Sequence, residues 1–143
     1  MKFSQDTFGS GYAIRAYDAA TVTIIGPGAP NENGSVQPVS EVLRRSFALA
    51  PDRLLRDWPP QQYADLHSEH FATLLALEPE VVLLGTGTSF RYPSPALLAL
   101  LAPLTALGIG VEVMDTGAAC RTYNVLAGEG RQVVAAILID DTP

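Results

Sequence analysis

Three short apolar runs in the carboxyl-terminal half constrain the fold of this chain most strongly. They occupy residues 81–84, 109–114 and 133–139, and each is rich in valine, isoleucine or leucine. Short apolar runs bounded by turn residues are typical of buried strands. Because helix signals stand between them, the order strand, helix, strand, helix, strand predicts a sheet whose faces are covered by helices.

The two helices between these strands have recognisable ends. Ser94 can accept a backbone hydrogen bond as N-cap, Pro95 suits the first helical position, and Gly108 suits the stop. Pro103 falls inside this helix and predicts a kink. Asp115 and Thr116 predict the start of the second helix, which should run to about residue 127 before a glycine-rich turn.

The amino-terminal half has mainly the pattern of antiparallel strands. Residues 12–17 and 21–25 alternate or are β-branched, and the short segment between them predicts a tight turn. Residues 26–34 concentrate glycine, proline and asparagine, so we expect a surface loop. Periodicity leaves residues 41–50 open between helix and strand. Further on, Ser68 can cap a helix that ends before Pro79.

Length and composition predict one globular unit. A chain of 143 residues fits a single domain, and 48% hydrophobic residues supply a core that needs neither a metal nor a disulfide. The chain has one cysteine, Cys120, and its start lacks a basic region followed by an apolar stretch, so we expect a cytoplasmic protein. No apolar run reaches about 18 residues, so no transmembrane segment is expected.

The charge balance bears on the kind of partner. Nine Lys and Arg residues against fifteen Asp and Glu residues give a net charge of −6. Such a surface repels phosphate backbones, so nucleic acid is not an expected partner. We expect a monomer or a small homo-oligomer, because exposed strand edges in the amino-terminal half could pair between subunits.

The loop after the first carboxyl-terminal strand is one candidate for chemistry. Gly85, Thr86, Gly87 and Thr88 would let backbone amides approach an anion, but the lysine of a P-loop and the spacing of a dinucleotide fingerprint are absent. A purely structural strand-to-helix turn is the alternative. Cys120 lies near a helix start, where a thiol can become reactive, although a buried structural cysteine is the expected role.

Other polar and aromatic residues allow two interpretations each. Arg121, Asn124, Glu129 and Arg131 could form a site near the last helix; alternatively Glu129 pairs with an arginine and Asn124 bonds backbone. Two histidines, at positions 67 and 70, do not complete a zinc site, and we predict no metal.

Trp58 and Tyr63 flank a Pro-Pro pair. They could form an exposed aromatic patch for a partner, or they could seal the edge of the core.

Residues 81–87 and 108–126, continued by 127–139, resemble the Mth-like domain family. That family includes a mitochondrial complex I assembly factor and an adipogenesis-associated protein. The resemblance implies a three-layer α/β fold with a mixed central sheet, and it favours strand for residues 41–50. No catalytic residue and no cofactor are implied.

Two functions follow from this reading. The first is a non-enzymatic interaction or assembly factor with a protein partner, by resemblance in respiratory complex assembly. The alternative is a small-molecule or anion-binding domain, with or without enzymatic activity, whose cleft lies at the carboxyl ends of the sheet strands. The candidates for such a site are Gly85, Thr86, Gly87, Thr88, Asp115, Thr116, Cys120, Arg121, Asn124, Glu129 and Arg131.

Overall fold

The strands form two separate sheets in a computed structural model that describes residues 11–89 and 91–139. The first sheet is antiparallel and three-stranded, in the order β1-β2-β3. Its strands are β1 (Ala13–Tyr17), β2 (Val22–Pro30) and β3 (Val36–Leu43). The antiparallel strands expected in the amino-terminal half are therefore present, but they form a sheet of their own.

The second sheet is mixed and has the order β5-β4-β8-β6-β7. Strands β6, β7 and β8 are parallel, whereas β4 runs antiparallel to β8 and to β5. The expected mixed central sheet is confirmed. Its strands are β4 (Phe47–Leu49), β5 (Leu54–Leu55), β6 (Val81–Gly85), β7 (Gly110–Met114) and β8 (Val133–Ile137).

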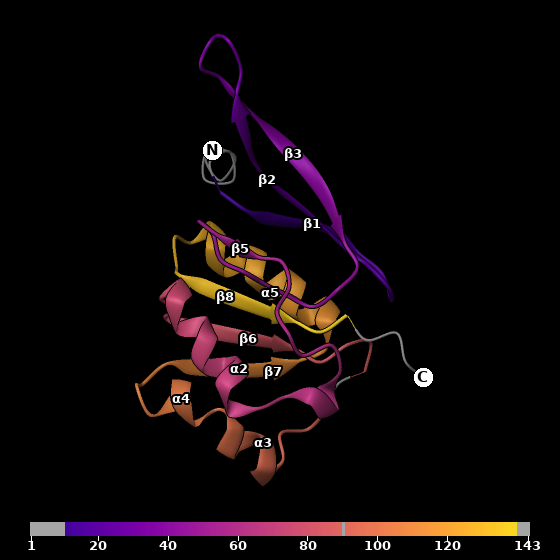
Figure 1. Ribbon diagram of the computed structural model, residues 1–143, viewed down its shortest axis with the longest axis vertical. Coiled ribbons are helices and arrows are strands. Elements are labelled where there is room, and N and C mark those ends of the chain that lie inside the picture. Colours follow the sequence, from indigo (N-terminus) through magenta and orange to yellow (C-terminus); the bar gives the residue numbers. More distant parts are fainter. Residues whose placement is uncertain (1–10, 90, 140–143) are drawn as a thin grey trace.

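Helices cover both faces of the mixed sheet (Figure 1). On one face lie the short helices η1 (Tyr63–Asp65), α2 (Ser68–Ala72), η2 (Thr73–Leu77), α3 (Pro95–Leu100) and α4 (Ala102–Thr105). On the other face lies α5 (Thr116–Gly128), and the three-stranded sheet packs beside it. The outcome is a three-layer α/β arrangement, with the β2–β3 hairpin projecting away from the rest.

Alternation along β8 explains why both faces need a cover. Val133, Ala135 and Ile137 belong to the core on the α5 side, whereas Val134 and Ala136 belong to the core on the side of the short helices. All of them are fully buried. A strand that is apolar on both faces is typical of a parallel sheet sandwiched between helices.

The predicted helix starts are confirmed at α3 and α5. Ser94 Oγ accepts a hydrogen bond from the Leu97 amide at 3.1 Å, and Asp115 Oδ1 accepts one from the Ala118 amide at 2.8 Å. The expected kink at Pro103 takes the form of a break, because α3 ends and α4 begins around Leu101. Proline lacks an amide hydrogen, so it fits the first turn of a new helix better than the interior of a long one.

Three boundaries differ from expectation. The loop predicted at 26–34 is wrong over its first part, because β2 continues to Pro30 and pairs with β3, leaving a short turn at 31–35. Asn31 Oδ1 accepts from the amides of Asn33 and Ser35 in that turn. The N-cap of α2 is His67, not Ser68. Strand β7 is an edge strand and is partly exposed, not buried.

The segment at 41–50, left open by periodicity, contains two strands. The end of β3 and the whole of β4 occupy it, and an irregular stretch at 44–46 separates them. The strand interpretation is therefore confirmed. The apparent helical spacing has no structural counterpart, because the chain passes here from one sheet to the other.

Trp58 is fully buried and does not form a surface patch. Its indole Nε1 donates to the His70 carbonyl at 3.1 Å, and its ring meets Phe71 edge to face at 6.0 Å. Tyr63 is half-buried and lies under the Arg91 guanidinium. The two aromatic residues therefore do not form an exposed patch, since the α2 segment covers the tryptophan.

We expect Trp58→Ala to lower the free energy of unfolding by about 3–5 kcal/mol, because it opens a cavity in the core and loses the indole hydrogen bond. Urea denaturation followed by circular dichroism measures this change. Leu107→Ala, at a side chain that is 66% exposed, is the control and should change stability by less than about 0.5 kcal/mol. Equal effects of the two substitutions would contradict the burial of Trp58.

Candidate functional site

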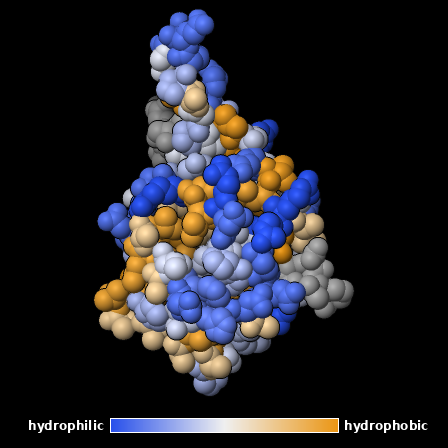
Figure 2. Space-filling view, viewed as in Figure 1, coloured by the Kyte–Doolittle hydropathy of each residue, from blue (hydrophilic) through white to orange (hydrophobic). Residues whose placement is uncertain are grey.

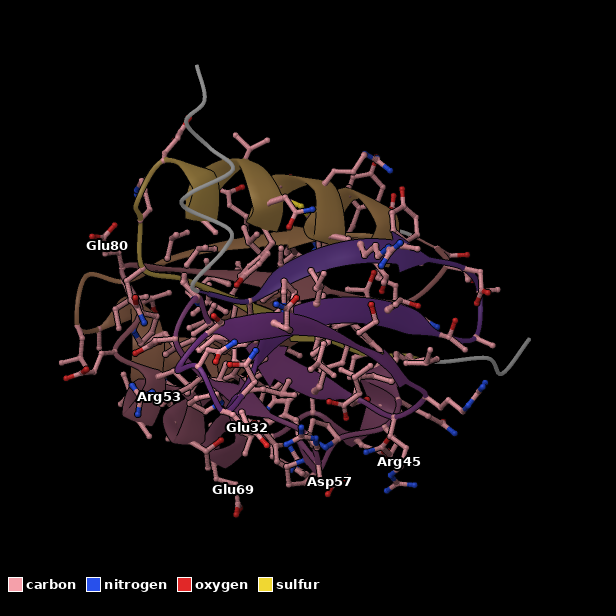
Figure 3. All side chains as sticks on the ribbon, turned by 90° about the horizontal axis from the view of Figure 1, so that it is seen from above. Glu32, Arg45, Arg53, Asp57, Glu69 and Glu80 are labelled. Carbon is pink, nitrogen blue, oxygen red and sulfur yellow. The ribbon has the colours of Figure 1, made fainter. Side chains whose placement is uncertain are left out.

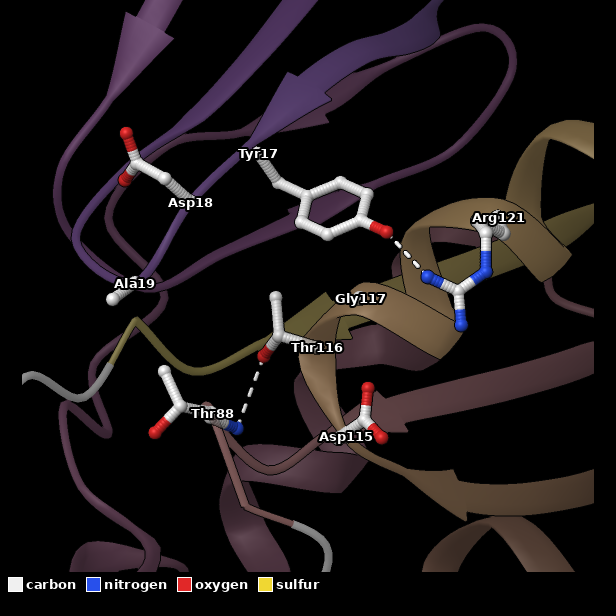
Figure 4. A pocket seen from close by; sticks show the side chains of 9 residues that line it. Tyr17, Asp18, Ala19, Thr88, Asp115, Thr116, Gly117 and Arg121 are labelled. Atoms are coloured by element: carbon white, nitrogen blue, oxygen red, sulfur yellow. Dashed lines mark hydrogen bonds between the residues drawn. The ribbon is translucent and has the colours of Figure 1, made fainter.

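A hollow of about 310 Å³ lies at the carboxyl end of the parallel strands (Figure 4). Three segments enclose it: the turn between β1 and β2, the loop after β6, and the first turn of α5. Its lining residues are Tyr17, Asp18, Ala19, Gly87, Thr88, Asp115, Thr116, Gly117 and Arg121. Open α/β sheets usually bind ligands at this edge, so the hollow is the candidate site.

The buried hydroxyl of Thr116 holds the floor of the hollow together. It accepts a hydrogen bond from the Gly87 amide at 3.0 Å and donates one to the Leu138 carbonyl at 3.1 Å. Gly87 has φ of 103°, a conformation that favours glycine. The loop after β6, the start of α5 and the end of β8 are thus joined through one side chain.

Close packing requires a glycine at the end of β6. A Cβ at Gly85 would lie 2.9 Å from a side-chain carbon of Ile137 and 3.2 Å from Thr116 Oγ1. Gly85 therefore lets α5 pack directly against the sheet. Its role is architectural, as is that of the buried Thr86, whose hydroxyl donates to the Ser89 carbonyl at 2.9 Å.

The wall opposite α5 comes from the β1–β2 turn. Arg121 Nη1 donates to the hydroxyl of Tyr17, which connects the helix to the hairpin. The Tyr17 ring lies so close to Gly117 that a Cβ there would be 2.9 Å from a ring carbon. Asp18 stabilises the turn itself, since its Oδ1 accepts from the amides of Ala20 and Thr21.

Carboxylates outnumber cations around the hollow. Asp18 and Asp115 line it with Arg121 as the single guanidinium. The hydrogen bonds from Ala20 and Thr21 lower the pKa of Asp18, so this carboxylate is charged near neutral pH. Asp115 already occupies the amino terminus of α5 through Ala118. This charge balance suits a polar or zwitterionic molecule better than a simple anion.

The structure brings together part of the predicted site. Gly87, Thr88, Asp115, Thr116 and Arg121 surround the hollow. The remaining candidates lie elsewhere. Glu129 and Arg131 follow the far end of α5, and Arg131 Nε donates to Glu80 Oε1 at 3.1 Å. One interpretation paired Glu129 with an arginine. Arg131 instead pairs with Glu80.

Asn124 binds the backbone of β1, in agreement with one of the two interpretations of its role. Its Nδ2 donates to the Ile14 carbonyl at 2.7 Å, and its Oδ1 accepts from the Ile14 amide at 2.9 Å. The side-chain amide thus pairs with the outer edge of β1 as a neighbouring strand would. A second contact from α5 is the Tyr123 hydroxyl, which donates to the Tyr12 carbonyl at 2.9 Å.

Cys120 is a buried structural cysteine. Its side chain lies in the core between α5 and the sheets, and burial raises the pKa of the thiol to about 12. Its position near the helix start does not offset this, because removing a thiolate from water costs more than the helix terminus restores. The expected burial of this cysteine is confirmed.

Sequence reasoning missed four lining residues: Tyr17, Asp18, Ala19 and Gly117. The tight turn after β1 was visible in the pattern, but its approach to α5 joins residues about a hundred positions apart. Gly117, directly after the helix cap, was the one local signal, because a glycine in a first helical turn is unfavourable unless something packs closely on it.

No metal-binding group is found in the described part of the chain. Among residues 11–89 and 91–139, no three His, Cys, Asp or Glu side chains cluster to hold an ion. His70 Nδ1 instead accepts from the His67 amide at 3.0 Å at the start of α2. Over the same residues, no helix is both long and apolar enough to cross a membrane.

Comparison with known proteins identifies the family. The profile of a family described as "Protein of unknown function (DUF498/DUF598)" matches residues 31–138. The chain belongs to this family. The match begins in the β2–β3 hairpin and ends just after β8, so it includes the whole mixed sheet.

Relatives of this family member include one with an assembly role in its name. NADH dehydrogenase (ubiquinone) 1 alpha subcomplex assembly factor 3 from Bos taurus is 38% identical over 93 residues, which is 64% of this chain and 48% of the relative. The chain thus spans about half the length of this curated relative.

Solved structures of family relatives have the same fold. A Xanthomonas campestris protein has 39% sequence identity and a TM-score of 0.70, covering 92% of this chain and 87% of its own. A Bordetella pertussis protein described as an Mth938-like domain has 31% identity and a TM-score of 0.64, covering 98% of this chain and 93% of its own. The resemblance to the Mth-like family is therefore confirmed.

We expect the native Cys120 thiol to react with iodoacetamide at pH 8 at least about 100-fold more slowly than in urea, because so little thiolate forms in the folded protein. Mass spectrometry of the time course measures both rates. Because the unfolded chain loses this proton at lower pH, the free energy of unfolding should also fall as the pH rises from about 9 towards 12.

Cys120→Ala is the control for this pH dependence and should make the fall shallower. Tyr123 contributes in the same direction, since burial raises its pKa as well. A native alkylation rate close to that in urea would contradict the burial of the thiol.

Proposed function

We propose that this protein is an assembly factor that acts by binding other proteins, in respiratory complex assembly or a comparable process. The observation that carries the proposal is the 38% identity over 93 residues to an assembly factor of NADH dehydrogenase. Because the aligned part is 64% of this chain, the similarity extends over most of an α/β unit and exceeds a single motif.

The chemistry of the described residues supports a binding role. The one thiol is buried with a raised pKa, and no cluster of ligands for a metal occurs among the residues described. Neither histidine has a serine or cysteine nucleophile as a hydrogen-bond partner in this region. A cytoplasmic location is part of the proposal, and the unpaired Cys120 supports it.

Affinity purification of the tagged protein at native expression from its own organism, after cross-linking, tests the assembly role. We expect a reproducible set of subunits or assembly proteins of one multisubunit complex, quantified by mass spectrometry. The control is the untagged strain. Absence of any protein enriched above this control would contradict the proposal.

The hollow beside α5 supports a second candidate, a small-molecule-binding domain. It gathers five predicted site residues around about 310 Å³, which reaches the lower end of ligand-site volumes. Arg121 and Thr88 offer hydrogen-bond donors, and Asp115 offers an acceptor. A polar molecule carrying both donor and acceptor groups fits this lining.

Native mass spectrometry of the protein purified from its own organism tests this second candidate. We expect a copurifying small polar molecule whose occupancy falls about tenfold or more in Arg121→Met, because a charged hydrogen bond is lost. Arg131→Met is the matched control, since its guanidinium pairs with Glu80 away from the hollow. Equal occupancy in the two variants would contradict a ligand in this hollow.

A further inference from the structure

The three-stranded sheet has one closed edge and one open edge. Asn124 closes the outer edge of β1 through its two hydrogen bonds to Ile14. Strand β3, at the other edge, pairs only with β2. Within residues 11–89 and 91–139, no backbone segment adds to the free side of β3.

The register shows which β3 groups point outward. Ile14 lies opposite Ile24 but directs its amide and carbonyl to Asn124, so Ile24 directs its own groups towards β3. Ile24 lies opposite Glu41, whose backbone therefore faces inward. The amides and carbonyls of its neighbours Ser40 and Val42 face the open edge, because backbone groups alternate along a strand.

Arginines gather along this edge of an otherwise acidic protein. Arg15 Nη1 reaches across the face of the sheet from β1 and donates to Ser40 Oγ at 3.1 Å, which places a guanidinium beside a side chain of β3. Arg44 and Arg45 follow the end of β3 and are exposed. The one carboxylate on the strand, Glu41, is already engaged by Arg56 through two hydrogen bonds of 2.9 Å.

A hollow continues the open edge at the end of β3. It has a volume of about 230 Å³ and is lined by Val42, Leu43, Arg44, Arg45, Arg56 and Asp57. Arg45 Nε and Asp57 Oδ1 lie 3.8 Å apart on the same side of the molecule (Figure 3), and both side chains are highly exposed. Exposed ion pairs of this kind contribute little to the stability of the fold, so Arg45 can exchange Asp57 for another carboxylate.

Strand β3 also exposes three valines. Val36, Val39 and Val42 are 45%, 53% and 48% exposed, and the alternation of side chains along a strand places Val36 and Val42 on one face and Val39 on the other. The hairpin tip is hydrophilic, and hydrophobic surface lies below it (Figure 2). Exposed edge strands are usually protected by charges or prolines. Pro38 faces this edge and offers no amide, but the only charged residue from 19 to 40 is Glu32 at the tip. The part of the edge at Ser40 and Val42 is therefore suited to pairing with another strand.

We propose that β3 binds an extended acidic segment of a partner protein, which adds as a fourth strand beside Ser40 and Val42. Backbone hydrogen bonds hold the segment, its carboxylates pair with Arg15, Arg44 and Arg45, and its apolar side chains on the opposite face cover Val39. The inference rests on the proposed protein-binding function and assigns it a surface and a partner chemistry.

Charge complementarity favours an acidic partner over a second copy of this chain. Strand β3 of a second copy would present Glu41 as its only carboxylate, and Arg56 already holds that group. The guanidinium hydrogen bonds lower the pKa of Glu41, so the pair remains charged near neutral pH. An acidic segment from another protein supplies the carboxylates that this edge lacks.

Peptide binding to the full chain tests the inference. The probe is a fluorescein-labelled ten-residue peptide of alternating Glu and Val, measured by anisotropy, with a matched Lys and Val peptide. We expect the acidic peptide to bind at least about tenfold more tightly. A third peptide with N-methylated alternate amides should lose binding, and the Ser40 and Val42 amides should gain protection from hydrogen exchange.

Charge reversal on the protein locates the site. Arg44→Glu should weaken the acidic peptide at least about fivefold, whereas Arg91→Glu, the same charge change at an exposed arginine outside this edge, should not. The inference is wrong if the two variants behave alike, if no peptide binds at millimolar concentration, or if N-methylation has no effect. Protection of Ser40 and Val42 in a dimer without peptide would identify a second copy as the occupant and overturn it.

The outcome also separates this inference from the proposed function. Cross-linked partners whose yield is unchanged by Arg44→Glu would leave the assembly role standing and remove β3 as its surface. Peptide binding at β3 without any cellular partner would contradict the assembly role and support β3 as a peptide-binding edge.

Discussion

Burial of β6 and β8 on both faces is the constraint on which the rest of this structure depends. Because their side chains alternate between two cores, neither face can remain in water. The short helices and Trp58 cover one face. The other face is wider than one helix, so α5 and the three-stranded sheet cover it together. The three-stranded sheet formed by the amino-terminal strands therefore covers part of this core.

Contacts between α5 and the three-stranded sheet shape the hollow, one of the two candidate binding surfaces. Asn124 pairs with Ile14, and Arg121 reaches Tyr17, so the β1–β2 turn is held above the start of the helix. The hollow at the carboxyl end of the strands is the space left beneath this turn. Asn124 also binds the outward-facing backbone of Ile14 at the β1 edge, whereas β3, at the opposite edge of the sheet, pairs with β2 alone.

Part of the candidate site could be predicted because local signals place it. Asp115 and Thr116 begin a helix directly after a strand, and Gly87 follows a parallel neighbour, so they had to meet at the same sheet edge. Arg131 could not be excluded in the same way, since its distance from the site depends on the length of α5 and on Glu80. The position of Tyr17 in the wall of the hollow could not be predicted, because no local sequence pattern shows that a hairpin contacts a helix so far along the chain.

The sequence by itself determined the carboxyl-terminal strands and the starts of α3 and α5, because apolar runs and helix caps act within a few residues. The three-layer α/β class was implied by the resemblance to the Mth-like family. It also favoured a buried structural role for Cys120, because no histidine stands near it in the sequence. Only the tertiary structure decided that the antiparallel strands form their own sheet, that Trp58 is buried, and that β3 keeps an open edge. These features depend on which surfaces meet across the chain, and such contacts are set by packing of the whole core.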